Sequence, residues 1–186
     1  MTYINIMVRL FVDIETNAVG SFRPPTQYPM QVAYIVTDDS GNEIIRKGST
    51  LVSGATEIGE FQKIFTLDQV NKEGVPPEEA VEMVLKDIDP EKTMIVAHNL
   101  DFDIGILLNH ANSEQKKKLR KMSKYDTMKM GTCICKIPNK NGYSDYKYPK
   151  LCELASHYNI STQDIQLHNA EVDTEVTRKC FVLMKK

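Results

Sequence analysis

Short segments rich in β-branched and aromatic residues recur along the sequence, and helix-like patterns separate the later ones. Segments 7–14, 30–36 and 43–52 have the composition and alternation typical of strands, and turn residues at 38–42 predict a hairpin between the last two. The short apolar run 93–97 is typical of a buried central strand. Strands that come first as hairpins and then alternate with helices predict an α/β fold, in which helices cover a sheet.

Helix signals follow the third strand. Pro76 and Pro77 precede Glu78 and Glu79, and apolar residues from Ala80 onward are spaced like the buried face of a helix. Residues 131–150 are rich in Asn, Gly and Pro and predict a long loop or a small hairpin. Further helices are expected at residues 103–110, 113–122, 151–158 and 170–184.

The length of 186 residues predicts a single domain, residues 1–186. Hydrophobic residues make up 41% and charged residues 26%, which excludes disordered, collagen-like and coiled-coil proteins. No apolar run approaches the roughly 20 residues of a membrane span, and residues 1–12 lack a basic leader and a cleavage site. With only four cysteines, we expect reduced thiols and an intracellular, cytoplasmic protein without a membrane partner.

The net charge of −2 conceals an uneven distribution along the chain. Residues 1–110 carry 8 Lys and Arg against 17 Asp and Glu, whereas residues 111–150 carry 11 against 3. A clustered basic segment is typical of nucleic-acid contact, although a solvated helix face gives the same pattern. On the first interpretation, Lys117, Lys118 and Lys121 contact substrate phosphates.

Two acidic residues end the first predicted strand. Asp13 and Glu15 are two positions apart, so both carboxylates project from the same face of the strand, while Leu10, Val12 and Ile14 project from the other. Paired carboxylates repel unless a proton or cation lies between them, which indicates a site for a hard, oxygen-seeking metal. The spacing alone is weak, because Asp-x-Glu occurs three times in this sequence.

Two later segments share a layout in which a histidine comes five residues before an aspartate. These are His98–Asp103, after the apolar strand, and His168–Asp173, at the start of the final helix. The ends of such elements can meet at one edge of an open α/β sheet. We therefore expect a carboxylate cage with one histidine beside it, built from Asp13, Glu15, Asp103 and Asp173.

Three segments together resemble the motifs of a known enzyme family. The chain contains Asp13-Ile14-Glu15-Thr16, His98-Asn99-x-x-Phe102-Asp103 and His168-x-Ala170-x-x-Asp173, in the order and with the separations of the DEDDh group of 3′-5′ exonucleases. This DnaQ-like group includes the epsilon proofreading subunit, ribonuclease T and oligoribonuclease. Weaker matches are Tyr125-Asp126-Thr127 and the segment from Pro149 to Tyr158.

The resemblance implies a ribonuclease H-like fold, a mixed five-stranded sheet flanked by helices. It also implies two divalent cations, Mg²⁺ with Mn²⁺ as a substitute. In such a site Asp13 bridges both ions, Glu15 and Asp173 complete the site for the attacking water, and Asp103 holds the second ion. His168 is expected to be the general base, because the unperturbed pKa of histidine, about 6.5, is near neutral pH.

Other residues near the motifs have less certain roles. We expect Thr16 and Asn17 to contact the terminal nucleotide, and His98 and Asn99 to have a structural or substrate-side role. Asp101 competes with Asp103 for the second-motif carboxylate, and the role of the 131–150 loop stays open.

The expected substrate is single-stranded or 3′-ended DNA or RNA, with DNA favoured and nucleoside monophosphates as products. Two alternatives remain: a ribonuclease that trims 3′ ends or short oligoribonucleotides, and a catalytically silent nucleic-acid-binding relative. The sequence ends at Lys186, shortly after the helix expected to carry Asp173. We therefore expect a free-standing enzyme whose activity requires neither a polymerase nor a homodimer.

Overall fold

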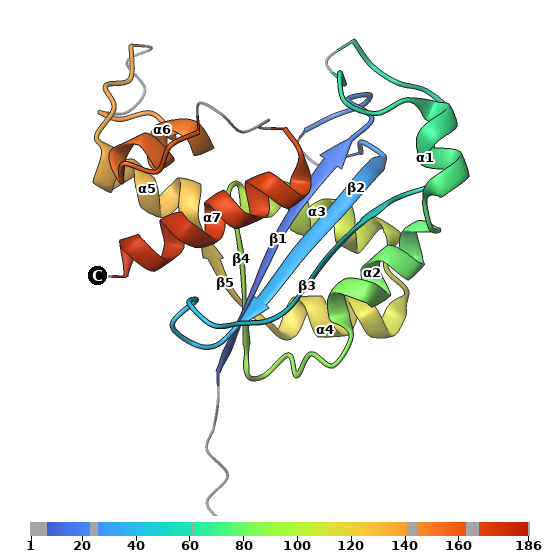
Figure 1. The fold of residues 1–186 in the computed structure, drawn as a ribbon, viewed down its shortest axis with the longest axis horizontal. Coiled ribbons are helices and arrows are strands. Elements are labelled where there is room, and N and C mark those ends of the chain that lie inside the picture. Colours follow the sequence, from blue (N-terminus) through green and yellow to red (C-terminus); the bar gives the residue numbers. More distant parts are fainter. Residues whose placement is uncertain (1–6, 23–25, 61, 141–144, 163–167, 186) are drawn as a thin grey trace, which may run out of the picture.

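The computed structural model describes residues 7–22, 26–60, 62–140, 145–162 and 168–185. Within them, five strands form one mixed sheet in the order β3-β2-β1-β4-β5. β2 runs antiparallel to both β1 and β3, whereas β4 and β5 run parallel to β1. The predicted mixed five-stranded sheet flanked by helices is thus confirmed (Figure 1). The strands are β1 (Val8–Thr16), β2 (Pro29–Thr37), β3 (Ile44–Leu51), β4 (Thr93–Ala97) and β5 (Ser123–Asp126).

Seven helices are present in this described part of the chain, and they cover both faces of the sheet. One of them, α7, crosses one face, and α2, α3 and α4 lie on the other (Figure 1). The helices are α1 (Leu67–Glu73), α2 (Pro77–Leu85), α3 (Leu100–His110), α4 (Ser113–Lys121), α5 (Thr127–Cys135), α6 (Leu151–His157) and α7 (Ala170–Met184). No helix among the described residues is both long and apolar enough to cross a membrane.

The alternation of β1 separates two cores. Leu10, Val12 and Ile14 face the larger core, which the apolar residues of α2 and α3 complete. Phe11 faces the opposite side and meets Phe181 of α7 edge-to-face, with ring centroids 5.3 Å apart. Because successive residues alternate, Asp13 and Glu15 lie on the same face as Phe11, toward α7. The predicted facing of these two carboxylates therefore agrees with the packing.

The structure differs from the sequence-based expectation mainly between residues 123 and 135. Strand β5 and helix α5 were not predicted, and residues 131–135 are the end of α5 rather than part of a loop. Of the long loop or small hairpin expected at 131–150, residues 136–140 and 145–150 are a loop with one bridge, between Pro138 and Tyr146. Residues 141–144 lie outside the described part. The short α1 was also missed.

Candidate active site

Strand β1 and helix α3 bring three carboxylates together. Asp13 and Glu15 are near the carboxyl end of β1, and Asp103 is in the first turn of α3, which follows the neighbouring strand β4. The Asp103 carboxylate accepts a hydrogen bond of 3.1 Å from the backbone N–H of Ile14. Asp103 is 3% exposed, and this bond places it against the β1 backbone between the other two acidic residues.

Helix α7 supplies the fourth carboxylate. Gln31 of β2 is registered opposite Glu15, and its side-chain oxygen accepts a 2.9 Å hydrogen bond from the N–H of Ala170, the first residue of α7. This contact holds the start of α7 beside the end of β1. Asp173, one turn into α7, is buried, and its Oδ2 accepts the backbone N–H of His168 at 3.1 Å.

The four carboxyl groups perturb one another. Burial, and then repulsion from Asp103, Asp173 and Glu15, raises the pKa of Asp13 well above its ordinary value. Burial, and then repulsion from Asp173, raises the pKa of Glu15 to about 7. The pKa of Asp103 is also raised well above its usual range, mainly by burial, although amide hydrogen bonds oppose the rise. Burial raises the pKa of Asp173 as well, while the hydrogen bond from His168 lowers it.

This arrangement fits divalent cations. Oδ1 of Asp173 is buried and has no hydrogen-bond partner among the described residues, so a hard ligand atom is available inside the site. One ligand atom each from Glu15, His168 and Asp173 lies within 4.8 Å of the other two. Bound cations would offset the repulsion that raises the carboxyl pKa values, and carboxylate oxygens are the ligands that Mg²⁺ and Mn²⁺ prefer.

His168 lies at the open side of the carboxylates. It is exposed and adopts a left-handed backbone conformation with φ 71°, and residues 163–167 before it lie outside the described part. Its backbone is tied to Asp173 by the hydrogen bond to Oδ2. The imidazole is therefore solvent-accessible and adjacent to the carboxylates.

The second histidine of the repeated layout has a different environment. Nε2 of His98 donates to the carbonyl oxygen of Pro149 at 3.0 Å, and Nδ1 lies 3.1 Å from Oγ1 of Thr127. Burial lowers the pKa of His98 below its ordinary value. With both ring nitrogens occupied, His98 connects the start of α3 to α5 and the segment before α6. This placement fits the structural role, which is one of the two roles expected for His98.

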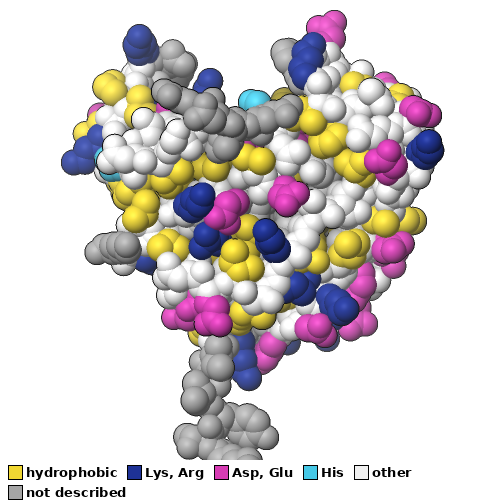
Figure 2. Space-filling model, viewed as in Figure 1, with side chains coloured by type: hydrophobic (Ala, Val, Ile, Leu, Met, Phe, Trp, Pro, Cys, Tyr) yellow, Lys and Arg dark blue, Asp and Glu magenta, His cyan; other side chains and the backbone are white. Residues whose placement is uncertain are grey.

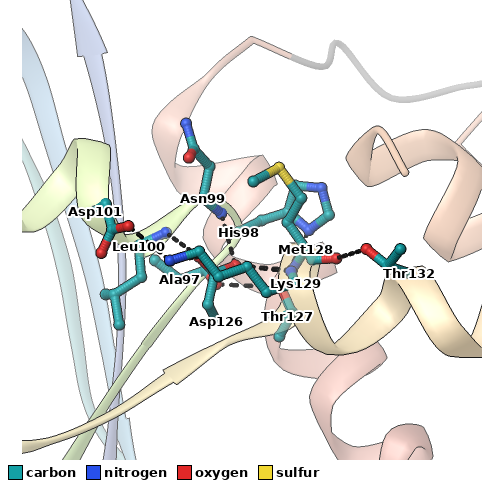
Figure 3. Close-up of polar contacts among 10 residues, drawn as sticks. All are labelled: Ala97, His98, Asn99, Leu100, Asp101, Asp126, Thr127, Met128, Lys129 and Thr132. Carbon is teal, nitrogen blue, oxygen red and sulfur yellow. Dashed lines mark hydrogen bonds and ion pairs between the residues drawn. The ribbon is translucent and has the colours of Figure 1, made fainter. Parts of the chain in front are cut away.

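Asp126 anchors the same region (Figure 3). Its carboxylate accepts hydrogen bonds from the backbone N–H groups of Asn99 and Leu100 at the start of α3, at 3.2 and 3.1 Å. It also accepts from those of Met128 and Lys129 at the start of α5, at 2.9 and 3.2 Å. One carboxylate thus caps two helices. Asn99 takes part through its backbone, in a left-handed conformation with φ 79°.

Asp101 and Asp103 occupy distinct environments, although both are in the first turn of α3. The Asp101 side chain is exposed and forms a 2.6 Å ion pair with Lys129 of α5, as Figure 3 shows. Only Asp103 lies against β1. The structure therefore brings Asp103, rather than its competitor Asp101, to the other carboxylates.

A cavity of about 620 Å³ opens beside the carboxylates and is lined by Glu15, Thr16 and His168 among others. Thr16, which was expected to contact the terminal nucleotide, belongs to its wall. The side chain of Asn17 instead holds the following loop, since its oxygen accepts the N–H groups of Val19 and Tyr28 at 3.2 and 2.9 Å. Sequence reasoning missed Phe22, Gln27 and Gln62 as cavity residues, because no motif or spacing marks them as neighbours in space. Phe102 belongs to the second motif, but its place in the cavity was not predicted.

The three lysines of α4 are not brought to this site. α4 leads into β5, whose first residue, Ser123, is paired with Met94 near the start of β4. Lys121 forms a 3.1 Å ion pair with Glu91, just before β4. The carboxylates are at the opposite ends of the parallel strands, so Lys117, Lys118 and Lys121 cannot contact the same nucleotide as Glu15. Figure 1 shows α4 at the lower end of the sheet.

The outer surface over α7 has a different character from the carboxylate site. Figure 2 shows Lys, Arg, Asp and Glu side chains of both signs interspersed across this face, with no extended basic region among the described residues. The ion pair of Arg178 with Glu175, both in α7, is one example, with the nitrogen and oxygen 2.7 Å apart. Among its described residues, this face therefore shows no continuous run of basic side chains that could contact successive phosphates.

Comparisons with known proteins identify the family and the fold. A profile of the family RNase_T, described as Exonuclease, matches residues 10–181. The fold is similar to exonuclease I from Methylocaldum szegediense, with a TM-score of 0.73 and 16% identity over 97% of this chain and 41% of that chain. It is also similar to E. coli exonuclease I in complex with a dT13 oligonucleotide, with a TM-score of 0.71 and 20% identity over 97% of this chain and 41% of that one.

The chain thus spans about two fifths of the length of these structures. A search of curated protein sequences finds no match. At such identities the structures establish the ribonuclease H-like fold, while the family profile covers most of the chain. The chain therefore belongs to the exonuclease family, as its DnaQ-like motifs predicted.

Proposed function

We propose that this chain is a DEDDh-type 3′-5′ exonuclease that hydrolyses phosphodiester bonds from the 3′ end of a nucleic acid and releases nucleoside monophosphates. The observation that carries the proposal is the convergence of Asp13, Glu15, Asp103 and Asp173 beside the exposed His168. These residues come from three segments far apart in the sequence, and they match the residue types of the three motifs. In this proposal residues 1–186 act as one exonuclease domain.

The carboxylates would hold two divalent cations, Mg²⁺ or Mn²⁺. In the proposed assignment Asp13 serves both, Glu15 and Asp173 hold one, and Asp103 holds the other. When bound, such a pair lowers the pKa of water and stabilises the leaving oxygen. The unpartnered Oδ1 of Asp173 supports its place in this set, since a buried acceptor without a donor otherwise costs about 1–3 kcal/mol.

His168 would remove the proton from the attacking water. One of its ring nitrogens lies within 4.8 Å of carboxylate oxygens of both Glu15 and Asp173, so a water held by those oxygens is within its reach. Solvent exposure lets the imidazole return the proton to bulk water after each cycle. His98 does not fit this role, because both of its ring nitrogens are already engaged.

The terminal nucleotide would occupy the cavity next to Glu15 and Thr16. Its volume of about 620 Å³ lies within the roughly 300–1,000 Å³ of ordinary ligand sites. We favour single-stranded DNA as the substrate, and E. coli exonuclease I of the same fold has been solved with dT13 and dA16 oligonucleotides. In the proposal the chain acts without a polymerase or a second copy.

The purified chain tests this directly. It is incubated with 5′-labelled single-stranded DNA, mismatched primer–template DNA or single-stranded RNA, each with Mg²⁺, Mn²⁺ or EDTA. We expect a ladder of shortened single-stranded DNA with either metal and none with EDTA. Preferential shortening of RNA would support the 3′-trimming ribonuclease instead. Binding without shortening under every condition would indicate a catalytically silent relative, and dependence on an added polymerase would indicate a proofreading subunit.

A further inference from the structure

Gln31 lies between the two parts of the carboxylate site. It belongs to β2, is 6% exposed, and pairs directly with Glu15 across the antiparallel β1–β2 ladder. Residues that pair directly in such a ladder have their side chains on the same face of the sheet. The Gln31 side chain therefore lies with Glu15 on the α7 side of the sheet, where its Oε1 accepts the 2.9 Å hydrogen bond from the N–H of Ala170.

The first N–H groups of α7 cannot bond within the helix, so their partners determine how the helix begins. The N–H of Glu171 bonds to the side chain of Asn169, close to it in the chain, at 3.0 Å. The bond between Gln31 and Ala170 instead joins the helix to the sheet, and Ala170 is fully buried. A second link, from Ser49 of β3 to the Glu171 carboxylate at 3.2 Å, is exposed, so water competes for both groups. The buried bond therefore constrains the start of α7 more tightly.

Two proposed functional residues lie close to this start. Asp173 is one helical turn after Ala170, and the hydrogen bond from the His168 N–H to its Oδ2 joins these two residues at 3.1 Å. Glu15 belongs to the sheet, so its distance from Asp173 and His168 depends on where α7 begins. One ligand atom from each of these three residues lies within 4.8 Å of the others. A small shift of the helix start would therefore change the geometry available to a cation.

We propose that Gln31 is a positioning residue: by holding the first N–H of α7, it sets the separation of Asp173 and His168 from Glu15, and with it the affinity of the site for divalent cations. The inference rests on the proposed function and adds how the fold holds the two sides of the site together. Gln31 acts through the residues that it positions and is not itself a proposed ligand. Contacts that orient metal ligands commonly affect both metal affinity and activity.

The test compares Gln31→Leu and Gln31→Glu with the unchanged protein. Calorimetric titration without nucleic acid measures the Kd of Mn²⁺, and steady-state kinetics on a 5′-labelled single strand measure kcat and KM. Gln31→Leu has no acceptor for the N–H of Ala170, so we expect it to weaken Mn²⁺ binding and to lower kcat by about 10- to 100-fold each. KM at saturating Mn²⁺ should stay within about twofold, because contacts with the substrate are unchanged.

Two further variants separate the hydrogen bond from the size of the side chain. Gln31→Glu keeps an acceptor oxygen on a side chain of the same length, and a negative charge is favourable at a helix start, so it should keep kcat and the Kd of Mn²⁺ within about threefold. Gln31→Asn is one methylene too short to reach Ala170 and should resemble Gln31→Leu. It is the variant to measure if Gln31→Leu does not fold.

Gln115→Leu is the matched control, because Gln115 is also a buried glutamine that accepts a hydrogen bond at a helix start. It is 3% exposed, and its Oε1 accepts the N–H of Asn112 at 2.9 Å, just before α4. This variant should lower the melting temperature without changing kcat or the Kd of Mn²⁺.

Unchanged kcat and Kd in Gln31→Leu would overturn the inference. So would a loss that Gln31→Glu does not restore, or one that Gln115→Leu reproduces. A chain whose variants differ in Mn²⁺ binding as expected, but which shortens no 3′ end, would refute the proposed function while the inference stands.

Discussion

Each of the four carboxylates is a proposed ligand of the same two-ion site, so replacing any one of them should impair the reaction. We expect Asp13→Asn and Asp103→Asn each to lower 3′-end degradation by more than about 100-fold, because each removes a proposed ligand of a compact two-ion site. The measurement is the rate of shortening of a 5′-labelled oligonucleotide in Mg²⁺. In EDTA, the melting temperature should be unchanged or higher, because the substitution relieves carboxylate repulsion.

Asp101→Asn is the matched control for Asp103→Asn, since both residues are in the first turn of α3 and only Asp103 contacts β1. The degradation rate of Asp101→Asn should stay within about twofold of the rate of the unchanged protein. Near-normal activity in Asp13→Asn or Asp103→Asn would contradict the two-metal assignment.

Substitution of the two histidines should affect different properties of the protein. We expect His168→Ala to lower turnover by about 10²- to 10⁴-fold, the usual effect of removing a general base, with little change in KM. We expect His98→Ala instead to lower the free energy of unfolding, because it removes the bonds to Thr127 and Pro149. Steady-state kinetics and urea denaturation of both variants separate these effects. A large drop in turnover in a stably folded His98→Ala, with His168→Ala unaffected, would reverse the assignment.

The raised carboxyl pKa values predict how the metal-free protein responds to pH. A carboxyl group whose pKa is higher in the folded than in the unfolded chain stabilises the fold when it is protonated. That stabilisation is complete below its ordinary pKa, and for Glu15 it is lost as pH rises through about 7. For Glu15 alone, the decrease is at most on the order of 3 kcal/mol.

We therefore expect the melting temperature in EDTA to fall between pH 5 and pH 8, and Mg²⁺ to restore it at pH 8. Glu15→Gln should reduce the pH dependence, whereas Glu43→Gln, at an exposed position, should not. An equally steep fall in Glu15→Gln would show that other groups cause it.

At the scale of elements, Asp126 connects the site to the elements that the sequence did not predict. We expect Asp126→Asn to lower the free energy of unfolding by about 1–3 kcal/mol, because the amide nitrogen replaces one of the two acceptor oxygens. It replaces either Oδ1, which accepts from Asn99, Met128 and Lys129, or Oδ2, which accepts from Leu100. Urea denaturation measures the change. The control Asp68→Asn, at an exposed position in the first turn of α1, should stay within about 0.5 kcal/mol. A comparable decrease in both would indicate an effect of charge rather than of capping.

The same elements show how far the sequence predicts the fold. Strands β1 to β4 were predicted because their apolar runs are long or alternating, and β1, β2 and β4 each supply buried residues to a core. β5 is four residues long and begins with the exposed Ser123 and Lys124, so no pattern marks it. α5 contains Gly131, at which a Cβ would lie 3.1 Å from Leu154. Its stability depends on this packing and on the Asp126 cap, which are contacts between segments that periodicity does not reveal.

The candidate site likewise contains some residues that the sequence predicts and others that it does not. The four carboxylates and His168 were expected to meet because each belongs to a local motif near the end of an element. Gln27 and Phe22 belong to no motif, and only the conformation of the loop between β1 and β2 brings them to the cavity. The three lysines were expected at the substrate because they form a charged run, but such a run reflects neighbours along one helix and not the distance of that helix from the carboxylates.

At the scale of the whole molecule, the position of α4 makes the contribution of its lysines to substrate binding depend on the length of the substrate. Parallel pairing puts the start of β5, and Lys121 just before it, level with Arg9 at the start of β1. Glu15 lies six residues farther along β1, or about 20 Å at the rise of a strand. A very short oligonucleotide held at the carboxylates cannot span that distance, whereas a long single strand can continue along the surface toward α4.

We therefore expect replacement of Lys117, Lys118 and Lys121 by Gln to leave the KM of a trinucleotide unchanged. For a 30-nucleotide single strand, KM should rise, and the slope of log K against log salt concentration should flatten by about 0.7 for each phosphate that a lysine no longer neutralises. Steady-state kinetics at several salt concentrations measure both. Replacement of Lys47, Lys72 and Lys86, which lie outside α4, by Gln removes the same three charges and is the control for total charge. An unchanged slope for the long strand would show that the basic face of α4 is only solvated, and an equal effect on the trinucleotide would mean that these lysines act at the carboxylate site itself.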